Sequence, residues 1–335
     1  MLPLLLPALL APGAIQATAP KANQPNPIPP KVTFDHAAIA LLTAYDAGRL
    51  MPPMPDLAPA DRPAYRWLRD CTLVKAGSLP ENPFPSGPKR IEAEAFRALL
   101  GLTPAEAVGR LPHLQAQELG TWMGLWRWGQ AQVRAGAWDR AQRRTWEDRL
   151  LAGKGLDLIQ GYAFRHALCF ALAEKDEARL GDLRGKTPED QDDLFAAAQV
   201  LFGHLGHPLP TVRLWTLPGL RLDDRPLAGL GGNRVWIAPF EGTLPRIPPG
   251  CAWVVPTAGG VADPTEATLD EVSTTEAGPV VQALQRTQDT AWLAPSRADF
   301  ERLGLVHFPA FLRFDAEGRL VEVRMGDAAP AQPGF

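Results

Sequence analysis

Three cysteines are the side chains with the most obvious chemical potential. Cys71, Cys169 and Cys251 lie far apart, so at most one disulfide can form within the chain and one thiol is left over. Cys169 lies in an apolar helical stretch, which favours a core position. Cys251 has no histidine or lysine nearby in the sequence to stabilise a thiolate, and nothing near Cys71 argues for activation. The sequence therefore indicates no reactive thiol, although an enzyme that uses a single cysteine stays an open alternative.

A pair of histidines carries a second kind of chemistry. His204 and His207 are three residues apart, a spacing at which two side chains can share one helical face and one metal ion. A metal site needs further ligands, and no glutamate separates these histidines as it does in a zinc protease motif. A helix end before Pro208 suits histidine equally well, because the ring interacts favourably with the helix dipole. We therefore predict no metal site and no cofactor.

A cluster of tryptophans is the third feature. Trp122 and Trp126 are four residues apart and share one helical face, so core packing is the expected role. Trp128 points elsewhere and, if exposed, would mark a groove for a partner. No serine, histidine and acid arrangement or carboxylate pair is specific enough to assign an active site. The net charge of −3 and the lack of a basic stripe argue against nucleic acid as a partner.

The elements that position these residues begin after an unusual N-terminus. Residues 1–19 form an uncharged apolar run that ends in small residues, which predicts a signal peptide and export to the periplasm, cell envelope or exterior. The run lacks an initial lysine or arginine, so a disordered apolar terminus is the alternative. Prolines at positions 3, 7 and 12 interrupt it too often for a membrane-spanning helix. Residues 20–33 form a proline-rich linker.

Residues 34–207 have a helical pattern. Thr103 with Glu106 and Thr187 with Asp190 each form the sequence signature of a capping box. Residues 122–153 resemble a single tetratricopeptide unit, with small or aromatic side chains at Gly129, Ala131, Gly136, Trp138 and Ala141. Thr145 and Asp148 depart from that repeat, and no second unit follows in register. Ordinary helical packing is therefore the alternative to a repeat array.

The pattern changes beyond residue 207. We expect a linker at 208–229, followed by short strands in RVWIAPF, CAWVVP, TAWLAP, AFLRFD and LVEVRM. The last two strands flank a turn that contains Gly318, as in an antiparallel hairpin. Pro309 directly precedes this hairpin and has no N–H to donate, so it must lie at a strand start or a sheet edge. A buried turn there could hold the Pro309 peptide bond in the cis form.

Residues 230–326 resemble the C-terminal half of the thioredoxin fold, because a short helix from Ser296, Pro309 and a β-hairpin follow one another in that order. The resemblance implies that CAWVVP is the central strand leading into the active-site turn, and that Pro309 is the family's cis-proline, which presents its backbone to bound peptide. Active members carry two cysteines in that turn, where this chain has TAGGVADP from Thr257 to Pro264. Without a thiolate there is no nucleophile for disulfide exchange. The family's terminal helix is missing as well, and residues 327–335 are expected to be a disordered tail.

The predicted fold is α+β, with an all-helical domain at 34–207 and a thioredoxin-like α/β domain with a mixed sheet at 230–326. The predicted function is that of an exported binding or assembly protein with a redox-inactive thioredoxin-like domain and an unknown protein or peptide partner in the cell envelope. The candidate contact residues are Pro309, His307, Phe308, Thr257, Gly259 and Trp128. The alternative is a thiol-dependent oxidoreductase or another envelope enzyme that uses a single cysteine.

Overall fold

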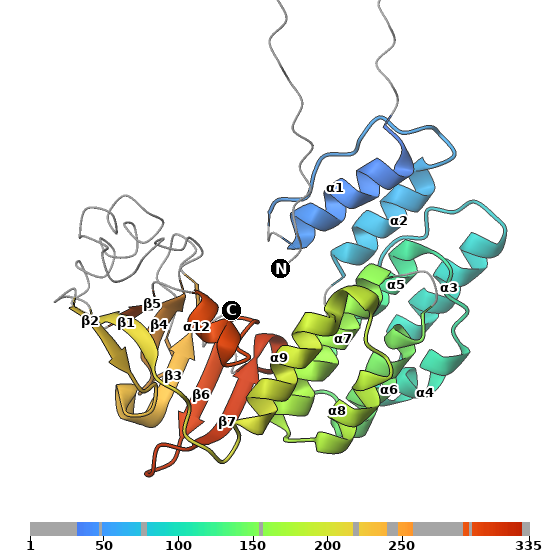
Figure 1. The fold of residues 1–335 in the computed structure, drawn as a ribbon. Helices are drawn as coiled ribbons and strands as arrows, with labels where there is room; N and C mark the ends of the chain where they lie inside the picture. The colour runs from blue at the N-terminus through green and yellow to red at the C-terminus, as the bar shows by residue number, and fades with distance from the viewer. Residues whose placement is uncertain are drawn as a thin grey trace, which may run out of the picture.

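The structure is a computed structural model that describes residues 32–46, 49–74, 79–153, 157–216, 221–239, 247–256, 291–294 and 297–329. Helices occupy the N-terminal part of these residues and a single mixed sheet the C-terminal part (Figure 1). This arrangement confirms the predicted α+β class. The predicted signal peptide, nearly all of the first linker, Thr257, Gly259 and Ser296 lie outside the described residues.

Nine helices of the described chain precede the sheet. They are α1 (Phe34–Asp46), α2 (Arg62–Thr72), α3 (Pro88–Leu100), α4 (Pro104–Arg110), α5 (Leu119–Arg134), α6 (Arg140–Leu151), α7 (Asp157–Ala173), α8 (Glu177–Arg184) and α9 (Asp192–Gly203). A tenth, α12 (Arg297–Arg302), lies between two strands. Many of these helices end within a few residues of the next one, so neighbours in sequence pack against each other.

One of the two predicted capping boxes is present. The Thr103 hydroxyl accepts a hydrogen bond from the Glu106 N–H, and the Glu106 carboxylate accepts one from the Thr103 N–H, at the start of α4. The box predicted at Thr187 is wrong. Its hydroxyl donates to the carbonyls of Leu183 and Arg184 at the end of α8, because α9 begins only at Asp192.

Helices α5 and α6, the region that resembles a tetratricopeptide unit, are joined by close packing around Trp146. Its indole N–H donates to the Leu125 carbonyl at 3.0 Å, and its ring stacks on Trp126 with centroids 5.4 Å apart. A Cβ placed on Gly129 would lie 2.0 Å from the Trp146 ring. Only glycine at this position lets the indole pack so close to the α5 backbone.

Within the described residues the sheet contains seven strands in the order β2-β1-β5-β4-β3-β6-β7. The strands are β1 (Val212–Thr216), β2 (Arg221–Arg225), β3 (Arg234–Ile237), β4 (Ala252–Pro256), β5 (Ala291–Ala294), β6 (Ala310–Phe314) and β7 (Leu320–Met325). Strands β3, β4 and β5 are parallel to one another, and the remaining pairs are antiparallel. The linker predicted at 208–229 is wrong, since β1 and β2 form an edge hairpin there. Flanking prolines and charged side chains obscured two strands of five residues each.

The β6–β7 hairpin is confirmed, and Gly318 in its turn has a φ of 77° that favours glycine. The Phe308–Pro309 peptide bond before β6 is cis, as expected. The resemblance to thioredoxins implies that the Pro309 strand lies beside the central CAWVVP strand, and the sheet order contradicts this expectation. Strand β4, the CAWVVP segment, is the middle strand and fully buried, but β3 separates it from β6. The neighbour of the Pro309 strand is therefore β3.

The helical part and the sheet are not separated at residue 207. Helices α7, α8 and α9 pack into the same apolar core as the sheet, while the N-terminal end of α7 also belongs to the core of α1 to α6. Helix α7 contacts β7 directly, and α9 lies beside α7 near the β6–β7 hairpin (Figure 1). Helix α7 is apolar on most of its circumference, which is the expected composition of a helix between two packed layers. The two parts therefore share one central helix.

Candidate functional site

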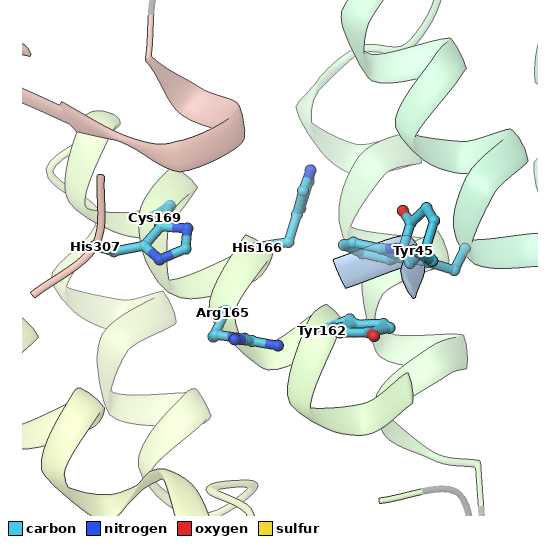
Figure 2. A pocket seen from close by; sticks show the side chains of 7 residues that line it. Tyr45, Tyr162, Arg165, His166, Cys169 and His307 are labelled. Atoms are coloured by element: carbon cyan, nitrogen blue, oxygen red, sulfur yellow. The ribbon is translucent and has the colours of Figure 1, made fainter. Parts of the chain in front are cut away.

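A pocket of about 300 Å³ lies along α7, where the helical part meets the turn before β6. Its lining residues are Tyr45, Trp126, Tyr162, Arg165, His166, Cys169 and His307. The four that come from α7 are spaced as i, i+3, i+4 and i+7, so they form one stripe about 10 Å long on the helix surface. We call this pocket the α7 groove. In Figure 2 the tyrosines lie at one end and His307 with Cys169 at the other.

The aromatic end of the α7 groove is built from three rings. Trp126 stacks on Tyr162 with centroids 5.5 Å apart, and Tyr45 meets Tyr162 edge to face at 6.4 Å. Arg127 on α5 donates to the Tyr45 hydroxyl at 3.1 Å and to the Thr72 carbonyl at 3.1 Å. These bonds hold Tyr45 against α5, so the aromatic wall is positioned by the core and not by solvent-exposed side chains.

His166 lies in the middle of the α7 groove and is oriented by a buried acid. Its Nδ1 is 3.0 Å from Glu147 Oε1, and the two residues are 3% and 1% exposed. Burial alone would raise the pKa of the Glu147 carboxyl. The hydrogen bond to His166 and the charges of His166, Arg143 and Arg179 outweigh burial and lower this pKa below its usual range. Because an ionised carboxylate only accepts hydrogen bonds, His166 carries its proton on Nδ1 and directs Nε2 away from Glu147.

Glu147 is in turn held by two arginines. Arg143 Nε and Arg179 Nη2 lie 3.2 and 3.1 Å from its carboxylate oxygens. Arg143 also pairs with Glu174 at 2.8 Å, and Arg179 pairs with Asp148 at 2.9 Å. The network connects α6, α7 and α8 beneath the α7 groove, so every movement of His166 would disturb several buried ion pairs.

Arg165 contributes a cation to the same stripe. Its guanidinium carbon lies 5.3 Å from the centre of the Tyr162 ring, and its Nε donates to the Gly161 carbonyl at 3.3 Å. Among the described residues no carboxylate forms an ion pair with Arg165. The side chain is half-buried, so the charge is held at the groove and not in bulk solvent.

The predicted contact residues near Pro309 have different positions. His307 lines the α7 groove, and its ring lies against Gly326, where an added Cβ would be 2.5 Å from the imidazole. Phe308 packs edge to face on Phe300 at 6.1 Å, and the Pro309 carbonyl accepts a hydrogen bond from the Gly326 N–H at 2.9 Å. His307 is therefore the residue of this turn that reaches the α7 groove.

Trp128 does not mark a groove, because it is only 4% exposed and meets Trp138 edge to face at 5.1 Å. Its neighbour Trp126, assigned to the core by spacing, lines the α7 groove while remaining buried. Sequence reasoning also missed Tyr45, Tyr162, Arg165 and His166. The spacing of Tyr162, His166 and Cys169 along one helix face was the available signal, but an apolar helix gives the same spacing in an ordinary core.

Each of the three cysteines carries a thiol and not a disulfide. Cys71 and Cys169 are buried, and Cys251 is half-buried. Burial, together with the charges of Asp70 and Glu92, raises the pKa of the Cys71 thiol well above its usual value. Burial also raises the pKa of the Cys251 thiol, which the charge of Arg234 offsets only in part. None of these findings indicates an activated thiolate.

We expect a maleimide reagent to label only Cys251 in the native protein, because the other two thiols are covered. Mass spectrometry of intact protein after brief labelling should show one adduct, and labelling in urea should show three. Rapid formation of two or three adducts without denaturant would contradict the burial of Cys71 and Cys169.

The remaining candidates are placed as follows. His204 caps the C-terminal end of α9, as expected for a histidine at a helix end. No group of three or more metal-ligating side chains occurs in the described part of the chain, and none of its helices is long and apolar enough to cross a membrane.

Comparisons with protein-family models, with curated proteins and with solved structures gave no match. The chain is thus an α+β protein whose function has to be inferred from the α7 groove.

Proposed function

We propose that this chain is an exported binding protein that holds a partner protein or peptide in the α7 groove. The observation that carries the proposal is the composition of the groove, because α1, α5, α7 and the turn before Pro309 all contribute to it. A concave site with aromatic walls and a few polar groups at a junction of two layers is typical of ligand binding. His307 belongs to the turn through which the resemblance to thioredoxins implies peptide contact.

The redox-inactive part of the proposal is supported by the sheet order. Strand β3 pairs with β6, and its last residue, Ile237, lies opposite Ala310, so the C-terminal end of β3 is the strand end beside Pro309. The connection from β3 to β4, residues 238–251, contains one cysteine, Cys251, directly before β4. Because β3 and β4 are parallel and Val235 lies opposite Ala252, Cys251 is at the end of the sheet away from Pro309. The segment after β4, which the resemblance to thioredoxins assigns to the active-site turn, has no cysteine from Thr257 to Pro264. Both assignments therefore leave the resemblance to thioredoxins without a thiolate.

A cross-linking experiment tests the proposal. Tyr45 is replaced by p-benzoylphenylalanine, an aromatic residue of related shape, in the full chain, which is irradiated in an extract of the source cells. We expect a discrete adduct, because Tyr45 lines the α7 groove. The matched control places the same residue at Ile91, which is 71% exposed on α3 and does not line the groove. The adduct should be absent there.

Three further arms sharpen the result. The variant with His307→Gln should lose most of the adduct formed from position 45, whereas His113→Gln, at an exposed position outside the groove, should keep it. Equal adducts from positions 45 and 91 would contradict a groove-specific partner. Circular dichroism of each variant verifies that the fold is retained.

A second candidate is an enzyme that uses a single cysteine. It is favoured by one observation, the presence of Cys169 in the same groove as the His166–Glu147 pair, which is the arrangement of a base and its orienting acid. The replacement Cys169→Ala separates the two candidates. If the partner adduct survives this change, binding needs no thiol. If the adduct disappears while the variant stays folded, the enzyme candidate gains support.

A further inference from the structure

Two nitrogen-bearing side chains of the α7 groove, Arg165 and His166, have binding capacity that no described side chain uses. Arg165 is half-buried and forms no ion pair with any described carboxylate. His166 is more than nine-tenths buried, and its Nε2 has no hydrogen-bond partner among the described residues. Buried polar atoms are nearly always satisfied in native proteins, so an unpartnered ring nitrogen at a pocket points to a group that is bound there.

The charge of the surrounding residues defines that group. The carboxylates beneath the groove already pair with arginines or lysine: Glu147 with Arg143 and Arg179, and Asp148 with Arg179 and Lys186. On the groove stripe the Arg165 guanidinium, which forms no ion pair with a described carboxylate, can donate hydrogen bonds to an anion, whereas Nε2 of His166 is an acceptor while the ring proton is on Nδ1. An arginine fork fits the two oxygens of a carboxylate.

One end of the α7 groove is aromatic. Trp126, Tyr162 and Tyr45 supply stacked and edge-to-face rings, which bury flat or apolar groups at low cost in conformational entropy. The stripe from Tyr162 to Cys169 is about 10 Å long, a length that matches about three residues of extended peptide.

We propose that the α7 groove binds a carboxylate attached to an apolar or aromatic body, with the carboxylate at Arg165 and the body against the aromatic wall. This inference rests on the proposed binding function and specifies its ligand. The carboxylate accepts hydrogen bonds from the Arg165 guanidinium. A peptide C-terminus and a small free carboxylic acid share this chemistry.

Calorimetric titration of the full chain tests the inference with two matched pairs of probes. N-acetylphenylalanine and its amide represent a peptide end, and 3-phenylpropionate and its amide represent a free acid. Within each pair only the charge and one acceptor oxygen differ. We expect each acid that binds to do so about tenfold or more tightly than its amide, since a charge-assisted hydrogen bond is lost in the amide.

Two variants assign the effect to Arg165. In the Arg165→Gln variant, the ratio of the dissociation constant of the amide to that of the acid should fall close to one. In Arg184→Gln, an exposed arginine on α8 that does not line the groove, the preference should be unchanged. Tighter binding of N-acetylphenylalanine than of 3-phenylpropionate would identify a peptide C-terminus as the source, and the reverse order a free acid.

Three results would overturn the inference: equal affinities for acid and amide, no binding of either acid at millimolar concentration, or a preference that persists in Arg165→Gln. The proposed function is judged separately by the cross-link from position 45. If that adduct forms while acid and amide bind equally, the α7 groove remains a binding site and only the carboxylate assignment fails.

Discussion

Replacing Glu147 with glutamine should lower the free energy of unfolding by about 3 kcal/mol or more at neutral pH, the usual cost of removing one partner from a buried ion pair. The substitution keeps the size of the side chain but leaves Arg143, Arg179 and the Nδ1–H of His166 facing a neutral amide. Urea denaturation measures the change. The account of the network is wrong if the variant unfolds within about 0.5 kcal/mol of wild type, as a surface substitution would.

The matched control is Asp148→Asn, at the next residue of α6. Asp148 also pairs with Arg179, but its side chain is 44% exposed, so its loss should cost about 1 kcal/mol or less. Since the pKa of Glu147 is lowered in the folded protein, its stabilisation is complete above the unfolded value of about 4.3 and is lost as the pH falls through the folded pKa. The difference in stability between wild type and Glu147→Gln should therefore shrink below about pH 4.3.

Gly304→Ala should have the second large effect. Gly304 follows α12 with a φ of 76°, and an added Cβ would lie 2.1 Å from the Ala197 carbonyl oxygen of α9. The obstacle is backbone, so α9 and the turn that leads to His307 would have to move apart. Overpacking and the left-handed conformation together should cost about 2 to 5 kcal/mol in urea unfolding.

Gly206→Ala is the control for that substitution. Gly206 has a similar φ of 83°, but nothing lies within 4 Å of the position that an added Cβ would take. Its cost should be limited to the conformational term of about 1 to 2 kcal/mol. If both alanine variants lose the same stability, the close contact between Gly304 and α9 does not exist in solution.

Much of the fold could be predicted from local patterns. The Thr103 capping box and the β6–β7 hairpin follow from residues that lie within a few positions of each other, and each is found as expected. The position of β3 between β4 and β6 could not be predicted in this way, because the order of short apolar strands depends on which faces the helices cover. Strands β1 and β2 were missed because prolines and charged side chains interrupt their apolar pattern.

The candidate site was harder to predict than the fold. His307 was identified through the proline turn, yet most of the residues that line the groove with it come from α7, more than 130 residues earlier in the sequence. Cys169 was assigned to the core, and Tyr162 and His166 were not singled out, because the same i, i+4, i+7 spacing describes a buried helix face. Glu147 was not singled out at all, since only the packing of α6 against α7 brings it to His166.

The α7 groove is the central claim about function, and the cross-link from position 45 tests it most directly. We expect a discrete adduct from p-benzoylphenylalanine at position 45. This adduct should be lost in the His307→Gln variant, and it should be absent when p-benzoylphenylalanine replaces Ile91 instead. An adduct of equal yield from positions 45 and 91, or one from position 45 that is indifferent to His307, would contradict it.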